Sequence, residues 1–261
     1  MRILPIGLYF MCGCLPQDFP GGGYSTTDTT IWLSEGSSTS SSEGSSSSTS
    51  SSTSLDYTFP EIFCGDGIVD GDEECDDGNK ISDDGCNNIC GRDRIVFVSS
   101  KPSTPEHMGS AKLAGDFCKQ LAGAAGLPNS KSYNVWLSDS KINARDRVYN
   151  GKGRYILVDG TVIANTFDDF LLTDVIDLQH PINLDQHGEF TVDGVWTGTK
   201  SDGTLAEDAN QCWDWSSGDI NGRAHFGVSV NVNAKWTLHP DPEVNPTSCA
   251  FGYRTYSFEG K

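Results

Sequence analysis

The chain has 261 residues and a formal net charge of −18, and its nine cysteines accompany long runs of Ser, Thr and Gly. This charge disfavours nucleic acid, heparin-like polyanions and anionic lipid head groups as partners, and it favours divalent cations or basic protein surfaces. The length allows one or two domains, and the cysteine content beside hydroxyl-rich spacers indicates an oxidising compartment.

Residues 1–14 predict a signal that ends in an acylated cysteine. Arg2 precedes an apolar run over residues 3–11, and Gly13-Cys14 closes the segment. The pattern resembles bacterial lipoprotein signals, in which a small residue precedes the acylated cysteine. The resemblance implies that Cys14 anchors the protein in the membrane by lipid, at the bacterial outer membrane or cell surface, with an extracellular head. An ordinary secretory signal or a misplaced start codon is the alternative.

Residues 15–62 predict a disordered tether. Residues 34–54 contain only Ser, Thr, Gly and Glu, a composition that buries too little apolar surface to offset the entropy lost on ordering. As a flexible coil the tether would span about 40 Å, which is enough to hold a domain clear of a membrane surface.

Residues 63–91 form a module rich in cysteine and aspartate. Nine acidic side chains and one lysine give residues 64–90 a charge of −8. Such a short segment has almost no core, so we expect two disulfides and a metal to hold it. The spacing does not choose among the three possible pairings of Cys64, Cys75, Cys86 and Cys90.

The oxygen-rich side chains of this module predict a Ca²⁺ site, because Ca²⁺ takes about six to eight oxygen ligands. The order of residues is not that of an EF-hand loop. A disulfide-bound turn with solvated acids and a zinc site built on the cysteines are the alternatives. The predicted ligands come from Asp66, Asp70, Asp72, Asp76, Asp77, Asn79, Asp83 and Asp84.

The order Cys64-Gly-Asp-Gly, Glu74-Cys75-Asp76-Asp77-Gly-Asn, Asp84-Gly-Cys86 and then Cys90 resembles the Myxococcus cysteine-rich repeat. That repeat is a short module of secreted and surface proteins. The resemblance covers residues 64–90 and implies an extracellular spacer or docking module.

Residues 92–261 have a globular composition and predict an α+β domain. Branched and aromatic residues predict strands at 95–98, 135–137, 155–158, 162–164 and 253–258. Asp159-Gly160 predicts a hairpin turn, and Thr166 could cap a short helix over residues 167–172. A longer helix opens at Pro105 and stops at residues 126–128, with a buried face formed by Leu113, Phe117 and Leu121.

Three of the six tryptophans fall in residues 195–215, between Gly- and Asp-rich turns. One interpretation is a core belt, because Trp side chains bury large areas. The other is a binding rim pinned by a disulfide of Cys212, and the two are compatible. The predicted rim residues are Trp196, Trp213, Asp214 and Trp215.

Short motifs from about residue 94 to residue 259 occur in a characteristic order, including Val135-Trp136-Leu137-Ser-Asp, Leu157-Val-Asp-Gly, Val195-Trp196-Thr-Gly-Thr and Cys212-x-x-Trp215. They resemble the domain of the leptospiral endostatin-like surface lipoproteins, which is similar to endostatin and to C-type lectin-like folds. The resemblance implies adhesion through a protein or glycan ligand at the cell surface.

The same resemblance implies the disulfide pattern of the domain. Cys212 is expected to pair with Cys249, whereas Cys118 is expected to be a buried free thiol because its family partner is Ser257 here. The sugar-binding residues of C-type lectins are absent. Residues 92–261 carry 16 basic and 21 acidic side chains, or −5, so a heparin site is not expected.

The sequence favours a non-enzymatic protein, because the five histidines are scattered and no familiar catalytic motif occurs. His180, His187 and Asp185 could form a metal or acid/base cluster, but a polar loop is the preferred interpretation. For Asp214, a structural hydrogen-bond acceptor is preferred to a catalytic acid. A secreted hydrolase with carboxylates from residues 185–214 and a structural envelope protein are the alternatives to a binding module.

Overall fold

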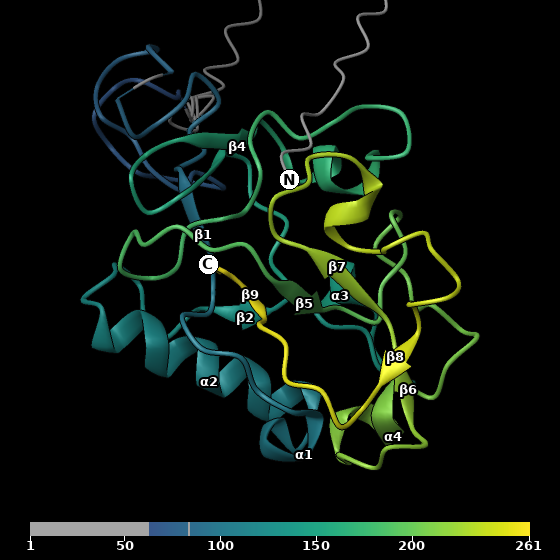
Figure 1. The fold of residues 1–261 in the computed structure, drawn as a ribbon. Coiled ribbons are helices and arrows are strands. Elements are labelled where there is room, and N and C mark those ends of the chain that lie inside the picture. Colours follow the sequence, from purple (N-terminus) through teal and green to yellow (C-terminus); the bar gives the residue numbers. More distant parts are fainter. Residues whose placement is uncertain (1–62, 83) are drawn as a thin grey trace, which may run out of the picture. The chain divides into compact units, whose positions relative to one another are not determined.

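A computed structural model describes residues 63–82 and 84–261 (Figure 1). The predicted signal, Cys14, the tether and the predicted ligand Asp83 lie outside the described residues. The cysteine-rich module contains two disulfides, and the domain after it has mixed α and β structure with few helices and small sheets.

The helices of the described part are mostly short. They are α1 (Pro105–Met108), α2 (Ala111–Ala124), α3 (Ala144–Arg147) and α4 (Gln211–Trp215), with the 3₁₀ helices η1 (Phe167–Leu171) and η2 (Ala234–Trp236). The strands are β1 (Arg94–Val98), β2 (Asn134–Val135), β3 (Tyr155–Ile156), β4 (Val162–Ala164), β5 (Gly194–Trp196), β6 (Arg223–Ala224), β7 (Phe226–Val228), β8 (Thr247–Ser248) and β9 (Tyr256–Phe258).

The largest sheet has the order β2-β9-β1-β3-β4, and the pairs β5-β7 and β6-β8 form two small antiparallel sheets. In the large sheet β9 runs antiparallel to both of its neighbours, whereas β1 and β3 are parallel. The predicted hairpin is confirmed: β3 and β4 pair antiparallel, and Gly160 in the turn has a φ of 89°, which favours glycine.

The large sheet separates two hydrophobic clusters. Phe97 and Val135 pair with Ser257 on either side of β9, and paired residues project to the same face of a sheet. That face meets the cluster of α2, with Met108, Cys118, Trp196 and Trp215. The other face, with Val96 and Phe258, meets an aromatic cluster that contains Trp136, Tyr155, Phe167, Phe170 and Trp236.

The buried face of α2 differs from the prediction. Leu113 and Phe117 are exposed, and the residues against the sheet are Ala111, Ala114, Gly115, Cys118 and Ala122. The reason is a close approach of the helix to β2: a Cβ on Gly115 would lie 2.4 Å from Asn134 Oδ1. Only small side chains fit there, so Leu113 and Phe117 point outward, whereas Leu121 is half-buried and packs against the cluster as predicted.

Local turn chemistry is confirmed at two other positions. Thr166 and Asp169 form a reciprocal capping box at the start of η1, although η1 is a 3₁₀ helix and ends one residue before the predicted end. The predicted helix from Pro105 is interrupted at Gly109, whose φ is 71°, so α1 and α2 are separate helices.

Candidate functional site

The Cys212–Cys249 disulfide marks the end of the domain that carries the predicted rim. The bridge implied by the family resemblance is present, with a Cα–Cα distance of 5.6 Å. It joins α4 to the residue that follows β8, and β8 in turn pairs with β6. Three segments that are distant in sequence are therefore held together at this end.

Residues 211–215 form a left-handed turn. All five, from Gln211 to Trp215, have φ between 44° and 67°, although none is glycine. Left-handed conformation costs about 1–2 kcal/mol per L-residue, and runs of it are rare. Strain of this kind persists only where surrounding contacts fix the backbone, and it concentrates at binding and catalytic sites.

Several contacts fix the left-handed turn. The carboxylate of Asp214 accepts hydrogen bonds from the backbone N–H and the hydroxyl of Ser140, at 2.8 and 2.6 Å. The indole N–H of Trp215 donates to the Ser138 carbonyl at 2.8 Å. Asp214 is thus an acceptor that positions the turn, as the preferred interpretation of the sequence had it.

The three tryptophans of the predicted rim occupy different environments. Trp196 and Trp215 are fully buried and belong to the cluster beneath the sheet, so the rim prediction is wrong for these two and the core-belt interpretation applies. Trp213 is 48 % exposed. Trp213 and Trp215 are two residues apart in the turn, so their side chains project in nearly opposite directions, Trp213 outward and Trp215 into the core.

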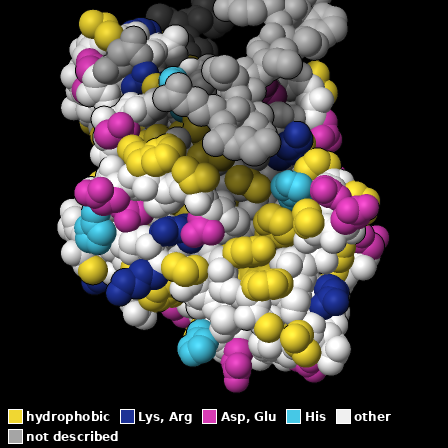
Figure 2. All heavy atoms as spheres, in the orientation of Figure 1, with side chains coloured by type: hydrophobic (Ala, Val, Ile, Leu, Met, Phe, Trp, Pro, Cys, Tyr) yellow, Lys and Arg dark blue, Asp and Glu magenta, His cyan; other side chains and the backbone are white. Residues whose placement is uncertain are grey.

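A groove of about 450 Å³ lies beside this turn. We call it the aromatic groove; its apolar walls are Phe226, Val244, Phe251 and Tyr253, and its charged walls are Arg223 and Glu243. Phe251 is 54 % exposed, and its ring is nearly parallel to that of Tyr253 at a centroid distance of 6.3 Å. Figure 2 shows hydrophobic side chains grouped over the region of β7 and β8, with charged groups between them.

The aromatic groove has a fixed shape. The ring of Tyr253 packs against Trp196 at 4.7 Å and against Phe226 at 4.9 Å. Asn245 accepts a hydrogen bond from the Phe226 backbone and donates one to the His239 carbonyl. A groove that is ordered before binding loses little conformational entropy when a ligand enters.

Trp213 adjoins the groove through the disulfide. A Cβ on Gly222 would lie 2.5 Å from the Trp213 ring and 2.6 Å from the Cys249 sulfur. Gly222 precedes Arg223 and Cys249 follows Ser248, and both of these neighbours line the groove. The exposed indole therefore lies near the aromatic groove, with the buried Gly222 and Cys249 between them.

A pair that the sequence did not single out lies close by. His225 is buried, and its Nε2 lies 2.9 Å from Asp208 Oδ1. Burial lowers the pKa of His225 from its ordinary value, against the opposing effect of the Asp208 carboxylate. Asp208 and His225 are 17 residues apart without a recognisable motif, so only the fold brings them together.

The predicted cluster of His180, His187 and Asp185 is not held together by side-chain contacts that the structure shows. Asp185 is buried and accepts hydrogen bonds from the backbone of His187 and Glu189. The His180 Nδ1 contacts the Val162 carbonyl instead. These contacts agree with the preferred interpretation of a polar loop.

The cysteine-rich module has the pairing Cys64–Cys90 and Cys75–Cys86. Ligand atoms of Cys64, Glu73 and Cys90 lie within 4.8 Å of one another. However, all four sulfurs are in disulfides, so none is a thiolate that could bind zinc as the alternative required. The disulfide alternative accounts for the cysteines.

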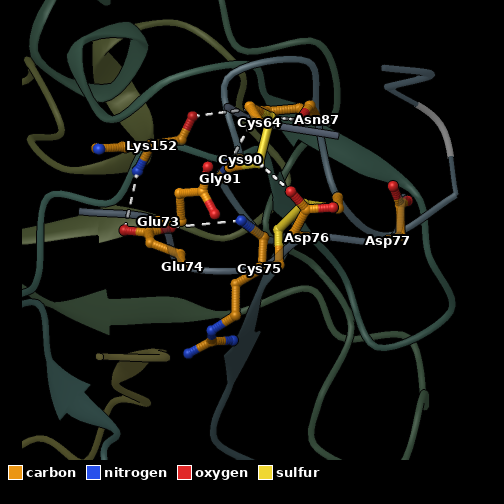
Figure 3. The surroundings of a disulfide bond; sticks show 12 residues. Cys64, Glu73, Glu74, Cys75, Asp76, Asp77, Asn87, Cys90, Gly91 and Lys152 are labelled. Atoms are coloured by element: carbon orange, nitrogen blue, oxygen red, sulfur yellow. Dashed lines mark hydrogen bonds between the residues drawn. A yellow bond between two sulfur atoms is a disulfide. The ribbon is translucent and has the colours of Figure 1, made fainter. Parts of the chain in front are cut away.

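Asp76 organises the module (Figure 3). Its two oxygens accept backbone hydrogen bonds from Gly65, Asp66, Gly67 and Gly78 at 2.7–3.2 Å. Desolvation alone would raise the pKa of Asp76, but these N–H donors outweigh it and lower the pKa. Each oxygen already has two backbone donors, which disfavours Asp76 among the predicted Ca²⁺ ligands, and the ligand set stays a prediction.

The other predicted ligands divide into two groups. Asp66, Asp77 and Asn79 each accept a hydrogen bond from the backbone two residues later, and Asn79 also donates to Asp84. Asp72 is exposed. Asp70 Oδ1 is buried without a hydrogen-bond partner in the described part of the chain, so a cation would benefit this oxygen most.

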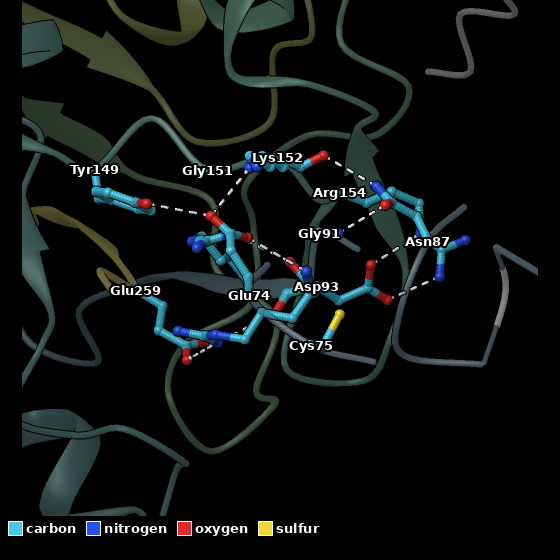
Figure 4. Close-up of polar contacts among 12 residues, drawn as sticks. Glu74, Cys75, Asn87, Gly91, Asp93, Tyr149, Gly151, Lys152, Arg154 and Glu259 are labelled. Atoms are coloured by element: carbon cyan, nitrogen blue, oxygen red, sulfur yellow. Dashed lines mark hydrogen bonds and ion pairs between the residues drawn. The ribbon is translucent and has the colours of Figure 1, made fainter. Parts of the chain in front are cut away.

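The module is tied to the domain by Glu74 (Figure 4). Its carboxylate lies 2.8 Å from the fully buried guanidinium of Arg94, and it also accepts hydrogen bonds from Tyr149 and from the Lys152 backbone. Burial raises the pKa of Glu74, but Arg94 and the other donors outweigh this effect and lower the pKa.

Further ion pairs surround this contact. Arg92 pairs with Glu259 after β9, and Asp93 pairs with Arg154 before β3. Arg94 also lies over the ring of Tyr149 at 4.7 Å. The first strand of the domain is therefore clamped from both sides at the point where the module ends.

Cys118 is a buried free thiol, as the resemblance implied. Burial raises the pKa of Cys118 to about 12. A thiol with so high a pKa is almost never a thiolate, so it packs as a small apolar group.

In a comparison with known proteins, one part of the chain matches a family model. A family model described as a domain of unknown function, DUF4215, matches residues 53–91. This match covers the cysteine-rich module and is compatible with a cysteine-rich repeat. A search of the curated proteins found no match. In the described part of the chain, no helix combines the length and the apolar character that crossing a bilayer requires.

Proposed function

We propose that the protein is a surface-anchored bacterial lipoprotein whose C-terminal domain binds an extracellular ligand, as an adhesion module does. The observation that carries this proposal is the exposed Trp213 on a strained turn beside the aromatic groove. Exposed Trp side chains next to ordered apolar grooves are typical of interfaces, where a few aromatic residues contribute most of the binding energy.

The charges of the groove indicate what kind of ligand it accepts. Arg223 and Glu243 carry opposite charges, so the groove itself favours no net charge on the ligand. The overall charge of −18 repels polyanions. We favour a protein ligand that inserts an apolar side chain between Val244 and Phe251, and a neutral glycan is the alternative that the experiment below distinguishes.

The fold that we propose for residues 92–261 is endostatin-like or C-type-lectin-like. The long helix α2 against a mixed sheet, the two small sheets and the Cys212–Cys249 bridge support it. Acylation of Cys14 and a Ca²⁺ site in the module belong to the same proposal. The free oxygen of Asp70 supports the Ca²⁺ site.

A second candidate function is supported by a specific observation. Asp208 and the buried His225 form a carboxylate–imidazole pair at a cavity of about 250 Å³, and Asp208 lies in the loops from which a hydrolase would take its carboxylates. A carboxylate positioned by a histidine can act as a general base. Hydrolysis of a peptide or glycan at this cavity is therefore the rival to binding.

The test is capture of ligands by the whole chain, with Cys14→Ser to prevent acylation. Arrays of extracellular proteins and of neutral glycans are compared, with Trp213→Ala and Phe251→Ala as the test variants. We expect each variant to weaken capture by at least about tenfold, as loss of a hot-spot residue does. Ile176→Ala is the matched control, since Ile176 follows η1 and is about as exposed as Phe251.

The outcomes separate the candidates. If the chain captures a protein and this capture is weakened in Trp213→Ala, the proposal is supported. If the chain captures only glycans, the ligand is a neutral glycan and not a protein. Capture that is equally strong in the parent and in both groove variants would sink the binding proposal. Breakdown of an arrayed ligand that is lost in Asp208→Asn would favour the hydrolase.

A further inference from the structure

The side chain of Gln211 connects His225 to the left-handed turn. Its Oε1 accepts the backbone N–H of His225 at 3.0 Å, and its Nε2 donates to the Ala206 carbonyl at 2.6 Å. These two contacts fix which end of the amide is oxygen and which is nitrogen. The same Nε2 lies 3.0 Å from Nδ1 of His225.

This geometry specifies the protonation state of His225. An amide nitrogen only donates, so Nδ1 must be the acceptor. The single proton of the imidazole is then on Nε2, where it donates to Asp208 Oδ1 at 2.9 Å. The hydrogen-bond network is complete for one neutral tautomer.

A second proton does not fit this network. It would place an N–H on Nδ1 directly opposite the N–H of Gln211, with the two nitrogens 3.0 Å apart. Rotating the amide by half a turn would bring Oε1 against the Ala206 carbonyl and Nε2 against the His225 backbone N–H. Either arrangement places two donors or two acceptors opposite each other in a buried site, which destabilises the network.

The other charged groups at His225 do not remove this conflict. Asp208 favours the imidazolium, but its side chain is 74 % exposed, so water screens its charge. The cavity beside His225 is also lined by Lys200 and Glu207, which carry opposite charges, and by a second histidine, His239. Burial prevails and keeps the pKa of His225 below its ordinary value of 6.5.

We propose that proton uptake by His225 releases Gln211, loosens the left-handed turn and moves Trp213, so that acid weakens ligand binding. Gln211 is the first residue of the turn, and Trp213 follows two residues later. The turn is strained, so loss of one anchor favours its relaxation. The Cys212–Cys249 bridge keeps the movement local. The effect on binding rests on the proposed function, whereas the conformational step does not.

The sign follows from the lowered pKa. The folded protein binds the proton less readily than the unfolded chain, so the contribution of this network to stability is complete above pH 6.5. It declines as the pH falls through the lowered value. We therefore expect Trp213 to be held at neutral pH and released in acid.

The experiment follows the fluorescence and acrylamide quenching of the whole chain with Cys14→Ser between about pH 8 and pH 4.5, where histidines titrate. The difference between this protein and the same chain with Trp213→Phe isolates Trp213. We expect one transition below pH 6.5, with the steepness of a single proton. His225→Gln should abolish it, and Asp208→Asn should move it to lower pH because the imidazolium loses its counter-charge.

His239→Gln is the matched control, since His239 lines the same cavity, and it should keep the transition. A transition that persists in His225→Gln, or that disappears in His239→Gln, would overturn the inference. If His225→Gln does not fold, an unshifted transition in Asp208→Asn has the same consequence. If ligand capture depends on Trp213 but the fluorescence shows no pH transition, this inference is wrong and the proposed function stands. If the fluorescence shows the transition but capture does not depend on Trp213, the proposed function is wrong and this inference stands.

Discussion

In the cysteine-rich module the organising contacts are two disulfides and the Asp76 carboxylate, whereas in residues 92–261 they are aromatic side chains on the two faces of a sheet. The module leaves its large apolar side chains in solvent, namely Phe63, Ile68, Val69, Ile81 and Ile89. The domain buries four tryptophans completely. The two regions are held folded by different contacts because a short segment cannot enclose a hydrophobic core, whereas a longer one can.

The contact between the two regions is neither a disulfide nor a packing of aromatic rings; it is a buried ion pair. Arg94 is a fully buried cation in the first strand of the domain, and its counter-charge, Glu74, comes from the module. A buried charge without its partner is strongly destabilising. The domain is therefore expected to depend on the module for electrostatic balance, and a fragment that begins at residue 92 would lack Glu74.

The largest effect is expected from Trp136→Ala, which tests whether the aromatic cluster holds the domain. Trp136 packs against Phe167, Phe170, Trp236 and Phe258. Its loss leaves a cavity, and we expect the free energy of unfolding to fall by about 4 kcal/mol in urea titrations. The exposed Trp213→Ala should change it by less than about 0.5 kcal/mol. Equal effects of the two would contradict the assignment.

Glu74→Gln tests the dependence of one region on the other. The amide keeps the shape of Glu74 but leaves Arg94 without a counter-charge, so we expect a loss of about 3 kcal/mol, shared by both regions. Asp72→Asn removes the same charge from an exposed position and should have little effect. If thermal unfolding of Glu74→Gln matches that of Asp72→Asn, the regions are independent.

Ser257→Cys gives the domain a disulfide of the kind that holds the module. Ser257 is buried in β9, and Cys118 lies on the buried face of α2. We expect a bridge that adds about 2 kcal/mol, the lower end of the usual range because engineered bridges introduce strain. Mass spectrometry under non-reducing conditions detects the bridge. Ser257→Ala is the control, and a free thiol count of two in Ser257→Cys would refute the pairing.

The smallest effect is expected from Asp76→Asn, which tests whether a carboxylate replaces a core in the module. Since the pKa of Asp76 is lowered on folding, its contribution is present above the unfolded value near 3.8 and is lost as the pH falls through the folded value. Asp76→Asn should lower the melting temperature at pH 7 and reduce its acid dependence. A melting profile like that of Asp72→Asn would remove Asp76 from this role.

Local chemistry explains what could be predicted from the sequence. The Asp159-Gly160 turn and the Thr166 cap depend on hydrogen bonds within a few residues, and both were predicted correctly. The face of α2 was not, because Gly115 and Ala114 are buried only through the approach of β2, which lies at the far end of the following loop. Periodicity alone favours the large apolar residues.

The candidate site shows the same limit. Trp213 lies in a left-handed turn that no residue preference indicates, since glycine is absent from residues 211–215. The aromatic groove combines Arg223 and Phe226 with residues 243–253, which meet through the β6–β8 pairing and through the hydrogen bond between Phe226 and Asn245. Such long-range contacts have no sequence signature.

The position of β9 has a consequence for the order of assembly. This strand, residues 256–258, lies between β1 and β2, which are made more than 100 residues earlier. During synthesis the sheet therefore remains open at its centre until residue 258 has left the ribosome. Until then α2 and the aromatic residues have no complete surface to cover, so we expect the domain to fold only after its last strand is available.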